Sequence, residues 1–185
     1  MEDIKDRLGE YKYIFFTKLQ NYLDTDLHFY GSIKRVDYIA NSSDVDILII
    51  TDNVKSMLSK IQSYLNVSKD KTQKIFQQHS VYDKGVITGY KIKYKNNDKD
   101  IEFDLLIYDD KFRKAVLQNI NDINNLPLYM IIILYILKIL YYKLHFISKQ
   151  IYNGLKCNIF GCYFNGKLRY YNKDNAATVT MLDNL

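Results

Sequence analysis

Apolar and polar positions follow two periods along the chain, and these periods predict an ordered series of helices and strands. Apolar side chains recur at helical spacing over residues 3–24, which predicts an amphipathic helix. Short apolar strands are predicted over residues 27–30 and 45–50, with a loop or short helix between them. The next helix is predicted from one apolar stripe, formed by Val54, Met57, Leu58, Ile61 and Leu65.

The middle of the chain predicts a hairpin. A polar helix containing Ile75 and Phe76 is expected first. Residues 86–95 then alternate as a strand, and residues 96–98 form the turn into a second strand over residues 100–108.

The last third predicts mainly helices. Asp109 or Asp110 caps one helix, and Pro127 suits the first turn of the apolar helix that follows. Residues 157–171 indicate a second hairpin, with Asn165-Gly166 at its turn.

This order of elements predicts an α+β fold, in which a mixed α/β sheet is flanked by helices. A C-terminal helical segment and a terminal β-hairpin complete it. We expect a core over residues 1–110 and a helical and hairpin part over residues 111–185, packed on that core.

Composition places the chain among ordinary globular proteins. Hydrophobic residues make up 48% and charged residues 25% of the sequence. Cys157 and Cys162 are too few for a disulfide framework, and their spacing does not fit a zinc site. Since the N-terminus also lacks the pattern of a signal peptide, we expect a cytoplasmic protein with reduced thiols.

One apolar stretch raises the question of a membrane span. Residues 128–147 are long enough to cross a bilayer, but Lys138 and Lys143 interrupt them. A lysine near the middle of a span is costly, so we expect a helix buried in the protein and no membrane contact.

Basic residues gather towards the C-terminus, among aromatic side chains. No acidic residue lies between Lys138 and Lys173. Two interpretations stay open, a solvated face and a patch that binds a nucleic-acid backbone. The residues of the candidate patch are Lys149, Lys156, Lys167 and Arg169.

Three carboxylates carry the candidate chemistry. Asp44 and Asp46 flank Val45 at the start of one strand and so project to the same side, while Asp104 lies on a later strand. Asp and Ser before a strand are common turn residues, which explains any one of these features. An acidic residue inside an apolar strand nevertheless costs free energy unless it is paired. Convergent carboxylates are ligands for Mg²⁺ or Mn²⁺.

In these residues the chain resembles the nucleotidyltransferase (DNA polymerase β-like) superfamily. The signature is a strand ending in Gly31-Ser32, then Asp44-Val45-Asp46 on a strand, then Asp104 on a later strand. The resemblance covers residues 27–108. Its branches most similar to this chain are the minimal nucleotidyltransferases and the oligoadenylate and cyclic-dinucleotide synthases.

The resemblance implies a reaction and roles for these residues. A two-metal nucleotidyl transfer would use Asp44, Asp46 and Asp104 as metal ligands and catalytic residues. Gly31, Ser32, Lys34 and Arg35 would bind the nucleotide. The substrate would be an NTP, for example ATP, and the acceptor a hydroxyl of RNA or protein. The oligomeric state stays open, as does a partner subunit. The alternative is a non-catalytic nucleotide- or RNA-binding subunit with the same fold.

Overall fold

The structure is a computed structural model that describes residues 4–40, 42–79, 86–96, 100–164, 168–171 and 178–180. Its chain forms two compact units. The first unit consists of Met1–Gln73 and Gly89–Asn124, and the second of Lys74–Thr88 and Asn125–Leu185. This division differs from the expected boundary after residue 110, because the helix that ends at Asn124 belongs to the first unit.

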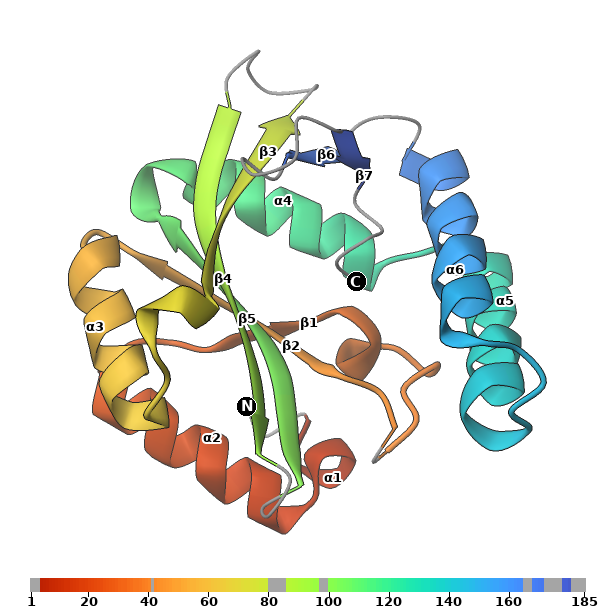
Figure 1. The fold of residues 1–185 in the computed structure, drawn as a ribbon, viewed down its shortest axis with the longest axis horizontal. Coiled ribbons are helices and arrows are strands. Elements are labelled where there is room, and N and C mark those ends of the chain that lie inside the picture. The colour runs from red at the N-terminus through yellow and green to blue at the C-terminus, as the bar shows by residue number, and fades with distance from the viewer. Residues whose placement is uncertain are drawn as a thin grey trace. The chain divides into compact units, whose positions relative to one another are not determined.

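The first unit is built on a mixed sheet, as the sequence predicted (Figure 1). Strand β2 (Val45–Thr51) lies between β1 (His28–Tyr30), to which it is antiparallel, and β5 (Ile101–Asp109), to which it is parallel. Strand β4 (Val86–Asn96) pairs with β5 as the expected hairpin. Hydrogen bonds connect all the strands in the order β1-β2-β5-β4-β3-β6-β7.

Helices α1 (Lys5–Leu8), α2 (Glu10–Leu23) and α3 (Val54–Leu65) pack on one face of this sheet. The predicted N-terminal helix is divided by Gly9, whose φ of 74° an L-residue rarely adopts. Alternation along the strands sends every second side chain into this core. Its fully buried members include Phe16, Leu19, Ile61, Ile47, Phe103 and Leu105.

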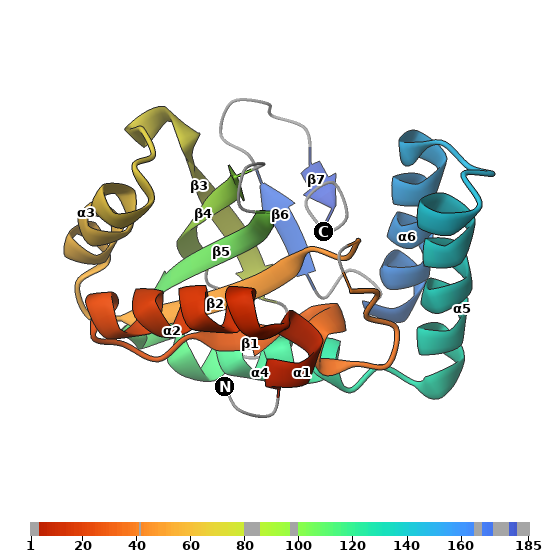
Figure 2. The same cartoon turned by 90° about the horizontal axis from the view of Figure 1, so that it is seen from below.

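The opposite face of the sheet is covered by α4 (Arg113–Asn124), which contacts β1 and β5 (Figures 1 and 2). Asp109 caps the turn before α4 by accepting a hydrogen bond from the Lys111 N–H, as expected. Leu48 and Tyr108 are buried on this face. Asp46 and Asp104 share the same face, nearer the start of their strands.

The second unit contains most of β3 (Thr72–His79) and the strands β6 (Leu168–Tyr171) and β7 (Thr178–Thr180). The prediction of a helix around Ile75 was wrong, because this segment pairs with β6 as an antiparallel strand. The prediction of a hairpin over residues 157–171 was wrong, because residues 157–164 belong to helix α6 (Lys149–Phe164). An antiparallel pair forms further along the chain, between β6 and β7. The expected turn at Asn165-Gly166 lies outside the described residues.

The apolar segment forms α5 (Leu128–Lys138), continues as a π-helical turn (Ile139–Lys143), and is followed by α6. Leu134 and Met130 are buried, but Leu128, Ile132 and Ile136 are about half exposed or more. The expectation of a helix buried in the protein was therefore wrong for one face of α5. In the described part of the chain no single helix is long and apolar enough to cross a membrane; the bent pair Asp110–Asn124 and Leu128–Lys143 meets that test by length and composition only.

Candidate active site

Strand register brings two of the three carboxylates together. Asp46 of β2 and Asp104 of β5 are direct neighbours in a parallel pair, at the spacing of adjacent strands. Val45 and Phe103, one position earlier on each strand, are buried in the core on the face that α1, α2 and α3 cover. Asp46 and Asp104 therefore project together from the other face.

Asp44 lies one residue before β2 and is exposed. Its carboxylate is close to Tyr38. The pKa of the Tyr38 phenol is raised, first by burial and then by the negative charge of Asp44. Asp44 thus stands at the entry to β2.

Gly31 brings the backbone against Asp46. It opens a 3₁₀ turn (Gly31–Lys34) directly after β1, and its φ is 73°. A Cβ atom at Gly31 would lie 2.7 Å from Asp46 Oδ2, closer than real side chains approach. Glycine is therefore required here both by the backbone conformation and by the space.

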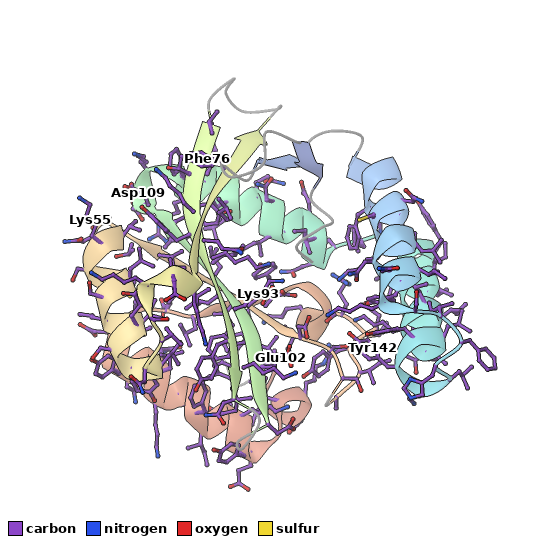
Figure 3. The ribbon with its side chains drawn as sticks, in the orientation of Figure 1. Lys55, Phe76, Lys93, Glu102, Asp109 and Tyr142 are labelled. Carbon is purple, nitrogen blue, oxygen red and sulfur yellow. The ribbon has the colours of Figure 1, made fainter. Side chains whose placement is uncertain are left out.

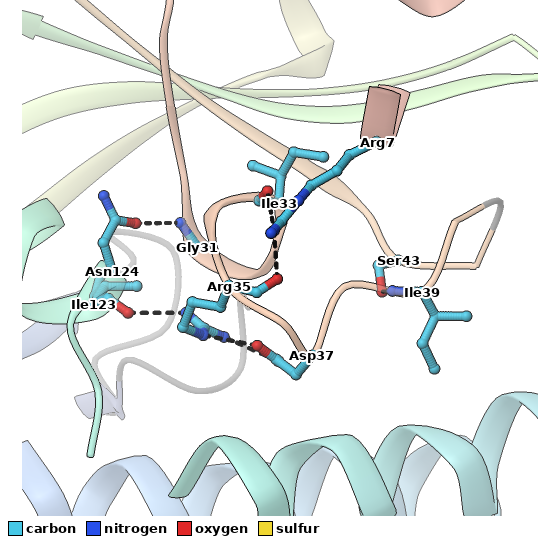
Figure 4. Close-up of polar contacts among 9 residues, drawn as sticks. All are labelled: Arg7, Gly31, Ile33, Arg35, Asp37, Ile39, Ser43, Ile123 and Asn124. Atoms are coloured by element: carbon cyan, nitrogen blue, oxygen red, sulfur yellow. Dashed lines mark hydrogen bonds and ion pairs between the residues drawn. The ribbon is translucent and has the colours of Figure 1, made fainter. Parts of the chain in front are cut away.

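The Gly31 N–H is not directed to a ligand. It donates a hydrogen bond of 2.9 Å to Asn124 Oδ1 at the end of α4 (Figure 4). This hydrogen bond fixes the turn, and the expected binding of nucleotide at Gly31 stays a prediction. Ser32 is buried beside it, and Lys34 at the end of the turn is exposed.

Arg35 also holds the loop together (Figure 4). Its guanidinium pairs with Asp37, at 2.8 Å from Nε to Oδ1, and donates to the Ile123 carbonyl at 2.9 Å. Arg35 is 7% exposed and Asp37 is fully buried. Arg35 thus has a structural role in this loop, because its guanidinium is buried and bonded to the protein, and its expected contact with nucleotide stays a prediction.

Arg7 of α1 completes this scaffold and was missed by sequence reasoning. Its Nη1 donates to the carbonyls of Ile33 and Arg35, at 2.9 and 2.6 Å. Because the acceptors are backbone atoms, no pattern of side chains in the sequence signals these bonds. The loop after β1 is thus held by α1, α4 and an internal ion pair.

Lys91 was missed as well, and it changes the site. Its Nζ lies 2.7 Å from Asp104 Oδ2, and Lys91 is 5% exposed. A signal was present in the sequence, since Lys91 and Lys93 alternate along the strand of the predicted hairpin that faces Asp104. Lys93 and Glu102 lie along the same hairpin (Figure 3).

The three carboxylates were expected to hold Mg²⁺ or Mn²⁺. Carboxylate oxygens suit Mg²⁺ and Mn²⁺, and the backbone of Gly31 lies directly against the Asp46 carboxylate. Asp104, however, is already paired with a cation. Among the residues that the structure describes, no three His, Cys, Asp or Glu side chains are grouped to hold a metal. Asp44 and Asp46 are the two carboxylates that could hold one cation, and the described residues do not group the three expected ligands around one ion.

The candidate nucleic-acid patch belongs to the second unit. Lys149 begins α6, and Lys156 lies on the same helix with its Nζ 5.9 Å from the centre of the Tyr152 ring. Arg169 is on β6, and Lys167 lies outside the described residues. The patch therefore stays a prediction.

A comparison with known protein families covers most of the first unit, from α2 to α4. Residues 13–120 match the nucleotidyltransferase domain family. The chain belongs to this family. The match runs from α2 into α4 and so includes Gly31 and all three carboxylates. No curated protein and no solved structure matches the chain. A nucleotidyltransferase domain implies an NTP substrate, and the strands of this one place Asp46 and Asp104 side by side.

Proposed function

We propose that this nucleotidyltransferase moves an NMP from an NTP to a hydroxyl group of RNA or protein, with Mg²⁺ or Mn²⁺. The observation that carries the proposal is the parallel register of Asp46 and Asp104, with Gly31 directly against Asp46, inside a nucleotidyltransferase domain. Asp44 and Asp46 would hold the cation. When bound, the cation would neutralise charge on the triphosphate.

The reaction is an in-line displacement at the α-phosphorus. The acceptor oxygen forms a bond to this phosphorus while the bond to the α,β-bridging oxygen breaks, and pyrophosphate leaves. Asp104 is proposed to receive the hydroxyl proton on the carboxylate oxygen other than Oδ2, since Oδ2 is bound to Lys91. The Ser32 hydroxyl and Lys34 are proposed to contact the β- and γ-phosphates.

Two acceptors fit the proposed chemistry. RNA is supported by the basic residues of α6, Lys149 and Lys156, on a segment without acidic residues. A protein hydroxyl is the other acceptor of the same chemistry. The ion pair at Asp104 supports one competing function, a nucleotide- or RNA-binding subunit without catalysis.

The test is transfer of label from each of the four α-labelled NTPs, with Mg²⁺ or Mn²⁺. The acceptors are total RNA, the protein itself, and no addition. We expect label in RNA or protein with the wild-type chain and at least a hundredfold less with Asp44→Asn or Asp46→Asn. Asp52→Asn is the matched control, since Asp52 is exposed just beyond the other end of β2.

Label transfer at the wild-type rate by Asp46→Asn would contradict the assigned site. Binding of NTP without transfer to any acceptor would favour the non-catalytic subunit.

A further inference from the structure

The pairing of Lys91 with Asp104 is not the one that strand register alone would select. In the antiparallel pair of β4 and β5, Lys93 lies directly opposite Asp104, and Lys91 lies opposite Leu106. Lys93 is exposed, whereas Lys91 is buried and reaches diagonally to the carboxylate. A long side chain can span this diagonal between neighbouring strands. The buried lysine, rather than the nearer exposed one, is the partner of Asp104.

A second ion pair on the same hairpin differs from the Lys91–Asp104 pair in its exposure to water. Lys95 and Glu102 also approach to 2.7 Å, but both side chains are more than half exposed. Such a pair forms and breaks freely in water. The Lys91 and Asp104 side chains are 6% and 15% exposed, so their ion pair is shielded from water. Separating this pair requires that another charge take the place of the lost partner.

A lysine in this position competes with a metal ion. A Mg²⁺ ion binds carboxylate oxygen at about 2.1 Å, and an ammonium on the same carboxylate would then lie within a few ångströms of a double positive charge. The two cations repel each other strongly in a partly buried site. Asp104 therefore accepts either the lysine or a metal.

Resting on the proposed function, we infer that Lys91 supplies at Asp104 the positive charge that a second metal ion would supply. The chain then binds one divalent cation with each nucleotide, at Asp44 and Asp46. Lys91 acts as a positioning residue, because its ion pair holds the Asp104 carboxylate in place beside Asp46 while the acceptor hydroxyl binds.

The test counts metal rather than turnover. The chain is mixed with Mn²⁺ and the four α,β-methylene nucleoside triphosphates, which bind without transfer. The complex is separated by rapid gel filtration, and Mn²⁺ and nucleotide are counted per chain. We expect one Mn²⁺ per nucleotide for the wild type and two for Lys91→Met, which leaves Asp104 available to a metal. Lys93→Met, on the same strand and facing the same carboxylate, is the matched control and should stay at one.

Two Mn²⁺ per nucleotide in the wild type would overturn the inference without touching the proposed function, and this result needs no variant to fold. One Mn²⁺ in both wild type and Lys91→Met would also overturn it, because freeing Asp104 would then create no metal site. A chain that retains neither nucleotide nor Mn²⁺ would overturn the proposed function and the inference together.

Discussion

At the residue scale, Gly31 connects the loop after β1 with the candidate site, because its backbone lies directly against the Asp46 carboxylate. We expect Gly31→Ala to lower the free energy of unfolding by about 1–3 kcal/mol, because of its positive φ, and to weaken nucleotide binding by displacing Asp46. Gly9→Ala is the matched control. Gly9 also has a positive φ, but no atom lies within 4 Å of the added Cβ. Thermal unfolding and equilibrium nucleotide binding measure both effects. Equal losses of nucleotide binding in the two variants would contradict a specific effect of Gly31 on Asp46.

His28, on β1, gives the fold a dependence on pH. Burial lowers the pKa of His28 below its usual 6.5, and the positive charge of Arg113 acts in the same direction, while Asp26 acts against them. The folded chain therefore binds a proton at His28 less readily than the unfolded chain does. Stability is lost as the pH falls through 6.5 towards the folded pKa.

We expect His28→Gln to flatten the decline in urea midpoint between pH 7 and pH 5. His145→Gln is the control, since His145 is exposed. An unchanged slope in His28→Gln would assign the acid sensitivity to other groups.

At the scale of elements, the loop between β1 and β2 depends on one buried ion pair. Asp37→Asn leaves the Arg35 guanidinium buried without its counter-charge, and we expect a loss of about 3–5 kcal/mol in the free energy of unfolding. Glu102→Gln breaks the exposed pair with Lys95, and we expect a loss below about 1 kcal/mol. Urea unfolding of the two variants measures the contrast. Comparable losses would mean that the Arg35 pair is open to water in solution.

Helix α5 offers a second contrast between its two faces. Leu134 is 3% exposed and Ile132 is 49% exposed. We expect Leu134→Ala to cost about 2–5 kcal/mol and Ile132→Ala to stay within about 1 kcal/mol in thermal unfolding. A large cost for Ile132→Ala would show that another surface covers this face in solution.

The elements that the sequence predicted correctly are those with a long pattern of their own. The hairpin of β4 and β5, strand β2 and helix α3 each carry a period that their surroundings reinforce. Strand β3 was missed because its apolar pattern around Ile75 is short and does not by itself distinguish a strand from a helix. Helix α6 was missed because Asn165-Gly166, a strong turn signal, outweighed the weaker helical pattern before it.

The carboxylates of the candidate site could be predicted from the sequence, but the partners of its basic side chains could not. Strand alternation and the spacing of the three acidic residues signalled the first part. The roles of Arg35 and Lys91 depend on which partner lies within reach once strands and loop are folded. In both cases the basic side chain is paired with a nearby carboxylate, Asp37 for Arg35 and Asp104 for Lys91.

At the scale of the whole molecule, charge is unevenly distributed between the two units. The described residues of the second unit include no Asp or Glu, while Lys149 and Lys156 lie on its helix α6. If RNA is the acceptor, we expect Lys149→Gln with Lys156→Gln to weaken RNA binding several-fold and to reduce its salt dependence. The matched control is Lys55→Gln with Lys60→Gln, two exposed lysines of α3. Equal effects in both double variants would leave the α6 lysines as a solvated face.

The division of the chain into interleaved segments sets the order in which the protein can be completed during synthesis. Strand β5 and helix α4 both come from the segment Gly89–Asn124, so a ribosome must release most of that segment before Asp46 gains its neighbour and Gly31 its bond to α4. Residues 74–88 emerge earlier but belong to a unit that is finished only by the last part of the chain. When the first unit is complete, the nascent protein therefore still carries β3 without its second neighbour, β6, and an unpaired strand edge invites mispairing.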